Sequence, residues 1–408
     1  MRITDRLPQR AATAQRGEEV GTRTGKTWTP VLLNRRGGVT MLRDVNTGRA
    51  MVRFRQDTES GSGPREAIEA FLGSGRLNFV STLAGVRLSA PGVDVLPALR
   101  LAFLDRPVEE VCASADLRDF AEFCIPEGSV FMPPDEDVLD DDDSDLYDHL
   151  KPLRASASTF TGETVDVALL DTGYFPHPEF YKRIKSAKSA VRDEDDVEDR
   201  NGHGTHCAGL IVGPRQGRDA YGIAPGASLH IVRILGEDGV GRDGDVLAGL
   251  LFAADVLKSR VIVLCCGVPD KNEYSRSTFE DTAKRVRNNH GVVIAPAGNR
   301  LEGDPDRVNY PANCPSVIAA GAVDRRLIDA GFSCIGSAMD PVEVTAPGVG
   351  VRSGWIDGMH RRASGTSMSA AITGGIAALL AQKLGGTGDL FNAVVKAQLG
   401  RAIRAPKD

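Results

Sequence analysis

The C-terminal part of the chain alternates short apolar runs with helix-like segments, and this alternation restricts the fold more than any other feature. From about residue 163 the apolar runs are VDVALLD, SLHIVRIL, VIVLCCG, VVIAPAGN and SVIAAGAVD, and the segments between them include DVLAGLLFAADVLKS and RSTFEDTAKRVRNNHG. Strands that are apolar on both faces occur in parallel sheets covered by helices on each side. We therefore predict the α/β class, with a doubly wound, mainly parallel sheet and helices on both faces.

The amino-acid composition indicates which kinds of binding partner to expect. The 408 residues are 41% hydrophobic and 25% charged, which suits a large globular domain plus a smaller one. The net charge of -6 argues against a nucleic-acid partner. No run approaches the roughly 18 apolar residues of a membrane span, so we expect no membrane partner.

The N-terminus and the cysteines are the features that indicate the cellular compartment. The first 20 residues are polar and basic without an apolar core, so we expect a cytoplasmic protein, with leaderless secretion as the alternative. The seven cysteines show neither CxxC spacing nor a zinc-like cluster, and we predict buried free thiols in a reducing compartment. They are Cys112, Cys124, Cys207, Cys265, Cys266, Cys314 and Cys334.

Shifts in composition divide the chain into four parts. We predict a poorly defined arm over 1–48, a small α/β domain over 49–117, an acidic linker over 118–162 and the large domain over 163–408. The centre of the linker, 133–150, holds nine carboxylates and one imidazole. Such a block repels itself, and it is either a solvated tether or a charged inhibitory or docking segment.

The small domain has its own order of elements. We predict a strand at AMVRF, a helix at PREAIEAFLGSG, a strand pair in LNFVSTLAGVRLSA, a helix at VDVLPALRLAFL and a strand at VEEVCAS. The order strand, helix, strand pair, helix, strand is that of a split βαβ unit.

Four polar residues stand where strands end or helices begin. Asp171 ends VDVALLD and Asn299 ends VVIAPAGN, at the strand edge where α/β folds place their sites. His203 lies in NGHGTHCAG, where glycines allow close approach of the backbone. Ser367 opens an apolar helix, where unpaired N–H groups and the helix dipole favour an oxyanion.

Each of these residues also has a plainer interpretation. Asp171 and Asn299 can serve as turn residues, and Ser367 can serve as a helix cap, a role that Thr366 can also fill. His203 and His206 can ligate a metal, although no third ligand pattern accompanies them. The order Asp, His, Ser is what makes the set specific.

The four motifs together resemble the subtilisin family. They are LLDTG at 169–173, NGHGTHCAG at 201–209, APAGN at 295–299 and SGTSMS at 364–369, and further matches are GIAPGASL, YPANCPSVIAAGAVD and VTAPG. The resemblance covers about 163–400, more than half of the chain.

The resemblance implies a serine endopeptidase that works through an acyl-enzyme. Ser367 would be the nucleophile, His203 the general base and acid, and Asp171 the group that orients the imidazole. Asn299 and the Ser367 N–H would form the oxyanion hole, and His206 would be structural. Alternatives are a peptide-processing transpeptidase and a non-catalytic regulatory module on the same fold.

The resemblance also places the substrate, a protein or peptide, between two backbone edges. These are Gly239-Val240-Gly241 and Cys265-Cys266-Gly267. The two cysteines either pack or make the cleft sensitive to oxidants. Arg300 would border the pocket for the residue before the scissile bond, where a cation favours Asp or Glu unless the side chain is merely exposed.

Three positions depart from the family. Ala371 stands where a proline is usual after the nucleophile. At the family's strong calcium site, Arg215 stands where an amide is common and Glu179 near a usual Asp ligand. We therefore predict that no cofactor is required, with calcium as the alternative.

The small domain over 49–117 resembles the family's inhibitory propeptide in element order and in its VRF strand. The resemblance implies that the protein's own N-terminal domain is an intramolecular inhibitor. We expect the isolated 1–117 fragment to inhibit in trans.

Overall fold

A computed structural model describes most of the chain beyond residue 47. The described residues are 31–33, 39–41, 48–54, 68, 80–82, 87–90, 93–114, 117, 121–132, 139–140, 148–217, 220–269, 273–300, 307–338, 341–399 and 402–407. The chain forms two units, Met1–Asp44 and Val45–Asp408. In the first, β1 (Val31–Leu33) and β2 (Val39–Met41) pair as an antiparallel hairpin.

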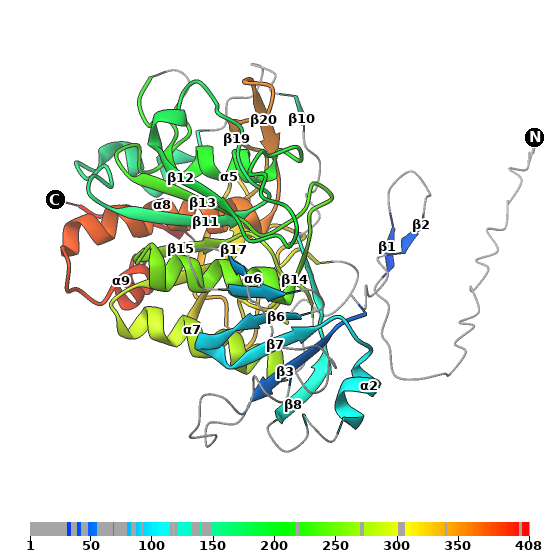
Figure 1. Ribbon diagram of the computed structural model, residues 1–408. Helices are drawn as coiled ribbons and strands as arrows, with labels where there is room; N and C mark the ends of the chain where they lie inside the picture. Colours follow the sequence, from blue (N-terminus) through cyan, green and yellow to red (C-terminus); the bar gives the residue numbers. More distant parts are fainter. Residues whose placement is uncertain are drawn as a thin grey trace, which may run out of the picture. The chain divides into compact units, whose positions relative to one another are not determined.

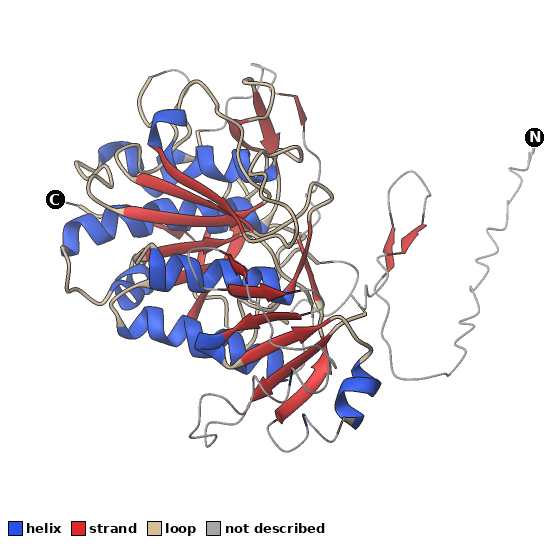
Figure 2. Cartoon of the chain, viewed as in Figure 1, coloured by secondary structure: helices blue, strands red, loops and turns tan. Residues whose placement is uncertain are grey.

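The second unit is built on a seven-stranded parallel sheet, which confirms the predicted fold class (Figures 1 and 2). The strand order is β12 (Ile184–Ser189), β13 (Ser228–Arg233), β11 (Asp166–Asp171), β15 (Val261–Leu264), β16 (Val292–Pro296), β17 (Val317–Val323) and β18 (Val344–Pro347). None of the helices in the described part of the chain has the length and apolar composition needed to cross a bilayer.

Helices cover both faces of this sheet because successive strand residues point to opposite sides. In β11, Val167 and Leu169 join the core of α5 (His203–Val212), α8 (Thr366–Leu384) and α9 (Leu390–Lys396). Ala168 and Leu170 join the core of α6 (Asp243–Leu251) and α7 (Glu273–Asn288). The result is a doubly wound arrangement.

A second, antiparallel sheet packs on α6 and α7. Its order is β4 (Val80–Thr82), β5 (Arg87–Ala90), β6 (Val93–Leu96), β7 (Leu101–Leu104), β3 (Ala50–Phe54) and β8 (Ala121–Pro126). Met51, Leu101 and Phe103 share the α6/α7 core, whereas Val52 and Leu104 belong to the small domain's own core. The small domain is therefore fixed to the large one through an apolar face.

Two predictions inside the small domain are wrong. VDVLPALRLAFL forms a hairpin of β6 and β7, because Pro97 opens a 3-10 turn (Pro97–Leu99) and Arg100 adopts a left-handed φ of 55°. VEEVCAS forms the helix α2 (Val108–Ala113), with Pro107 at the N-cap and acidic residues in its first turn. The strand at AMVRF is confirmed as β3, and the pair after it as β4 and β5. The predicted helix at 64–75 lies outside the described residues apart from Ile68, which is helical.

The predicted boundary at residue 117 is also wrong. β8 completes the small sheet beside β3, and β9 (Ser129–Phe131) pairs with β14 (Val240–Arg242) of the large domain. Residues of α4 (Leu150–Leu153) and η3 (Ala155–Ala157) lie in the α5/α8 core. Apolar residues of the presumed linker are therefore used in packing, while most of its acidic block lies outside the described residues.

The remaining strands are short and are not part of the central sheet. β10 (Leu139–Asp140), β20 (His360–Ala363) and β19 (Val351–Gly354) form an antiparallel sheet, and β21 (Gln398–Leu399) pairs with β22 (Ala402–Ile403). A 3-10 turn, η4 (Tyr181–Arg183), precedes β12, and a π-helical turn, η5 (Phe252–Val256), follows α6.

The prediction of seven free thiols is wrong for one pair. Cys112 of α2 and Cys124 of β8 form a disulfide, with Cα atoms 5.8 Å apart. The pairing depends on packing of α2 against β8, which spacing in the sequence does not reveal. The other five cysteines are buried and free, as predicted.

A pH-dependent stability follows from buried His149, whose Nε2–H donates to the Tyr221 carbonyl at 2.8 Å. Burial lowers the pKa of His149 to about 4, below its unfolded value of about 6.5. The unfolded chain binds a proton that the folded chain excludes, so this contribution is present above about pH 6.5 and lost as pH falls toward 4, by up to about 3 kcal/mol.

We expect His149→Gln to make the free energy of unfolding less dependent on pH in this window. The measurement is chemical denaturation of the Ser367→Ala chain with and without the substitution, at about pH 7 and about pH 4.5. His206, whose pKa burial lowers to about 3, contributes equally to both chains. Equal slopes in the two chains would contradict the assignment.

Candidate active site

The candidate site begins where β11 ends and α5 begins. The Nδ1–H of His203 donates to Asp171 Oδ1 at 2.8 Å, and both side chains are within 1% of full burial. Asp171 Oδ1 also accepts from the Thr172 N–H at 2.7 Å. This hydrogen bond fixes the tautomer of the imidazole, so that Nε2 can act as a base.

Asp199 organises the first turn of α5, and the sequence analysis missed it. Its two carboxylate oxygens accept from Thr172 Oγ1, Asn201 N, Gly202 N, Thr205 N and Thr205 Oγ1, at 2.7–3.0 Å. Thr172 Oγ1 in turn accepts from the Gly204 N–H at 3.0 Å. One buried carboxylate therefore ties β11 to the backbone around His203. An Asp two residues before Asn-Gly at a helix start is the signal that could have found it.

Gly202 is required by its neighbour Trp355. Its φ is 104°, and a Cβ atom there would lie 2.3 Å from the Trp355 ring. The ring of Trp355 also meets that of His206 edge-on, with centroids 6.1 Å apart. The turn between β19 and β20 therefore packs directly on the residue before His203.

Ser367 is the second residue of α8, as its motif predicts. Its hydroxyl is buried and has no hydrogen bond within the described part of the chain. Two buried thiols lie near these groups: Cys265 Sγ is 4.0 Å from the Ser367 carbonyl oxygen, and Cys207 Sγ is 4.0 Å from His203 Nδ1. Bonds between a nucleophile and its base are often long in unliganded sites.

Cys265 is not a candidate nucleophile in this geometry. Burial raises the pKa of Cys265, so that its thiol stays protonated. Ala371, at the position where the family usually has proline, is buried in an unbroken α8.

Asn299 follows β16 and is oriented by Thr366. Its Oδ1 accepts from the Thr366 N–H at 2.9 Å and from Thr366 Oγ1 at 2.8 Å. Because Oδ1 accepts two hydrogen bonds from Thr366, the orientation of the carboxamide is fixed, and its NH₂ group is the part that can donate to an anion. Gly298 before it has a φ of 112°, and a Cβ there would lie 2.4 Å from the Asn309 side chain.

The two expected substrate edges are bridged by a segment of the chain itself. Val240↔Phe131, Gly241↔Val130 and Arg242↔Ser129 are antiparallel partners. The Met132 N–H donates to the Gly239 carbonyl at 2.8 Å. On the other side, the Gly267 N–H donates to the Phe131 carbonyl at 2.8 Å, and the Gly267 carbonyl accepts from the Phe131 N–H at 3.3 Å.

Other members of the predicted substrate set lie apart from this pairing. The side chains of Cys265 and Cys266 point into the two opposite cores of the large domain. Arg300 Nε donates to the Ser333 carbonyl at 2.8 Å, which holds the guanidinium against the loop. The expected preference for acidic residues stays a prediction.

His206 has the contacts of a structural residue. It is fully buried and its Nε2–H donates to the Val351 carbonyl at 3.0 Å. The described residues hold two groups with metal-ligand spacing, Asp171–His203–Cys207 and His177–Glu179–His360, and His206 is in neither.

The residues at the family's calcium position do not fit calcium. Calcium needs a shell of oxygen ligands. Here the buried Arg215 guanidinium donates to the carbonyls of Phe160, Ile223 and Ser158 at 2.6, 3.1 and 3.0 Å. A positive group of the chain itself engages oxygens that a cation would need.

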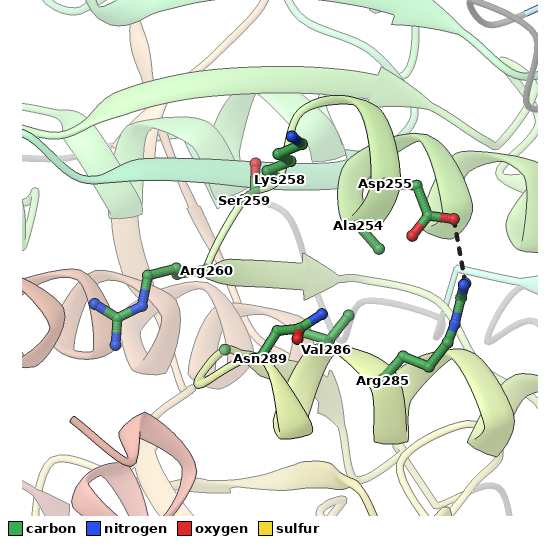
Figure 3. Close-up of a pocket in the computed structure, with 9 residues that line it drawn as sticks. Ala254, Asp255, Lys258, Ser259, Arg260, Arg285, Val286 and Asn289 are labelled. Carbon is green, nitrogen blue, oxygen red and sulfur yellow. Dashed lines mark hydrogen bonds and ion pairs between the residues drawn. The ribbon is translucent and has the colours of Figure 1, made fainter. Parts of the chain in front are cut away.

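A cavity of about 370 Å³ lies away from all these residues (Figure 3). It is lined by the end of η5, by Ser259 and Arg260 before β15, and by Val286 and Asn289 near the end of α7. It lies at the amino ends of the parallel strands, opposite the ends that carry Asp171 and Asn299. The close-up shows the Asp255–Arg285 ion pair at its rim.

The fold and these groups define a class: an α/β protein with a buried Asp–His pair and a buried serine in the first turn of a helix. The sequence pattern of the subtilase family matches residues 162–404. The chain therefore belongs to the subtilase family.

Three relatives show how much of the chain is shared. M-protease of Shouchella clausii (strain KSM-K16) is 34% identical over 223 residues, which are 55% of each chain. Subtilisin BL of Lederbergia lenta is 34% identical over 55% of this chain and 78% of its own. Subtilisin-like protease 2 of Pseudogymnoascus destructans is 38% identical over 55% of this chain and 53% of its own. The matched part is little more than half the length of two of these three relatives.

We expect Asp199→Asn to lower the free energy of unfolding by at least about 2 kcal/mol, because the amide turns an NH₂ group toward buried donors. Asp195→Asn is the matched control, since Asp195 is exposed, and we expect it to change stability by less than about 0.5 kcal/mol. The measurement is chemical denaturation in the Ser367→Ala chain. Equal effects of the two substitutions would show that Asp199 does not organise this turn.

Proposed function

We propose that this protein is a serine endopeptidase whose triad is Asp171, His203 and Ser367. The observation that carries the proposal is the buried 2.8 Å hydrogen bond from His203 Nδ1 to Asp171, with Ser367 in the first turn of α8. A serine in the first turn of a buried helix lies at the positive end of the helix dipole. These are the parts that acyl transfer through serine requires.

The proposed reaction has two stages. Ser367 Oγ attacks the scissile carbonyl carbon, and its proton passes to His203 Nε2. Asp171 stabilises the imidazolium, which then gives the proton to the leaving amine. The Asn299 NH₂ group and the Ser367 N–H donate to the oxyanion. In the second stage water attacks the acyl-enzyme with His203 again as base, and the acid product leaves.

The chain's own N-terminal region is the proposed inhibitor of this site. Residues 128–132 lie between β14 and Gly267, and an extended substrate would use the same backbone donors and acceptors. A substrate can bind there only after this segment leaves. The segment also follows directly from β8 of the small domain, so docking of that domain holds it in place.

Buried ion pairs hold the small domain in that position. Arg49, 4% exposed, pairs with Asp94, Asp105 and Glu127 at 2.6, 2.5 and 3.0 Å. Asp105 is also paired with Arg192 of the large domain at 2.8 Å. Glu127 Oε1 accepts from the Gly244 N–H in the first turn of α6.

Burial raises the pKa of Glu127. The N-terminal dipole of α6 and the Arg49 guanidinium favour its charged form. The same contacts show that a fragment ending at residue 117 would lack β8, Glu127 and the segment in the cleft. We therefore expect inhibition in trans from a fragment that extends through residue 132, and little from 1–117.

The triad is tested with a fluorophosphonate probe and a peptide substrate. We expect Ser367→Ala to abolish labelling and His203→Ala to lower kcat/KM by about 10⁴-fold or more. Asn299→Ala should lower kcat by about 10²–10³-fold, a range measured on a subtilisin, while labelling persists slowly. Labelling that survives Ser367→Ala would instead support a non-catalytic module on this fold.

The inhibitory segment is tested in the full, uncut chain, with its mass checked. Phe131→Pro removes the N–H that bonds Gly267 and should expose the cleft, raising the rate of probe labelling by about tenfold for roughly 1.4 kcal/mol of lost pairing. Phe131→Ala keeps the backbone bonds and is the matched control. If the two variants label at the same rate, the segment does not block the site.

A further inference from the structure

A second group of ligand-type side chains lies outside the catalytic residues. His177 and Glu179 lie in the loop after β11, and His360 begins β20. One ligand atom of each lies within 4.8 Å of the other two. Glu179 Oε2 is 3.0 Å from His360 Nε2 and 3.9 Å from His177 Nδ1.

The surroundings of this group orient two of its members. The Nε2–H of His177 donates to the Met359 carbonyl at 3.1 Å, which leaves Nδ1 as the acceptor of the ring. In the metal-free structure Nδ1 accepts a long hydrogen bond from the Glu179 backbone N–H, at 3.4 Å, which a metal would have to replace. The Tyr221 hydroxyl donates to Glu179 Oε2 at 2.5 Å. Metal-binding imidazoles and carboxylates are typically held by such outer hydrogen bonds.

We propose that His177 Nδ1, the Glu179 carboxylate and His360 Nε2 bind a divalent transition metal, with Zn²⁺ as the reference ion. Around a four-coordinate zinc with bonds of about 2.0–2.2 Å, ligand atoms lie roughly 3.3 Å apart. The observed 3.0 and 3.9 Å lie on either side of that value. Two imidazoles with one carboxylate suit zinc, whereas calcium takes oxygen ligands only. Glu179 and His360 are partly exposed, which leaves a position for water.

Arg352 competes with the metal. Its Nη2–H donates to His360 Nδ1 at 3.0 Å, so the proton of the neutral ring is on Nε2, pointing at Glu179. When the metal binds Nε2, that proton moves to Nδ1 and Arg352 leaves. The guanidinium already lies 5.9 Å from the centre of the Tyr221 ring, an alternative partner for it.

The metal would join the turn of β19 and β20 to the loop after β11. The same hairpin carries Trp355, which covers Gly202 next to His203. β20 also pairs with β10, through Leu139↔Arg362. We therefore expect metal binding to reduce the flexibility of the β19–β20 hairpin, which contacts both the start of α5 and the N-terminal region.

The test is titration of Zn²⁺ into the metal-free, full-length Ser367→Ala chain, by calorimetry and by thermal unfolding. We expect one zinc per chain and a rise in Tm. His360→Gln and Glu179→Gln should each weaken binding by at least about 100-fold, and Tyr221→Phe by about tenfold. Arg352→Met should tighten binding, a change that a merely structural His360 would not show.

The other cluster of ligand-type groups supplies the control. Cys207→Ala alters the Asp171–His203–Cys207 group and should leave the proposed zinc affinity unchanged. The proposal is overturned if the parent chain binds no zinc, if His360→Gln binds as tightly as the parent, or if binding is lost in Cys207→Ala alone. Because the parent chain lacks the nucleophile, the outcome does not depend on the proposed protease activity.

Discussion

The buried hydrogen bond between Asp171 and His203 is the interaction on which the site depends. A carboxylate with no exposed surface is costly unless it is paired and hydrogen-bonded, so the fold must hold β11 and α5 in register. Asp199 does this by gathering the backbone N–H groups around His203. Gly202 and Trp355 complete the turn, because no side chain fits between them. The position of one imidazole thus follows from contacts on three elements.

Backbone pairing is the physical basis of the proposed competition between the N-terminal region and a substrate. The backbone groups of β14 and of Gly267 pair with opposite sides of the same segment, residues 128–132, which lies between them as an added strand. Any extended peptide can make these backbone hydrogen bonds. Which peptide binds is therefore decided by the additional contacts that each one makes. The N-terminal segment is covalently continuous with the small domain's sheet, which packs on the large domain. That sheet places Phe103 in the α6/α7 core and Arg49 in a buried ion network. A free peptide has only its own side chains to contribute.

Sequence patterns were reliable where the chain is buried on both sides and unreliable where it is half-buried. The parallel strands were recognisable because both faces are apolar, as in VIVL of β15. In the small domain, VDVLPALRLAFL contains enough leucine to suggest a helix, yet each half alternates between two cores and Pro97 forces the turn. The Cys112–Cys124 pair could not be predicted, since it depends on packing of α2 against β8. The predicted domain boundary near residue 117 was wrong because the acidic block at 133–150 made the whole segment from 118 resemble a linker. The short strands β8 and β9 in that segment were therefore not recognised.

From the amino-acid order alone came the α/β class, the family resemblance and the identity of Asp171, His203, Ser367 and Asn299, because these lie in local motifs at strand ends and helix starts. Tertiary structure alone revealed the contacts of Asp199, the segment that pairs with β14 and Gly267, and the His177–Glu179–His360 group. Each of these brings together residues far apart in the chain, such as Phe131 with Gly267 or Glu179 with His360. Periodicity and motifs report only on near neighbours along the chain, whereas such contacts depend on how whole elements pack.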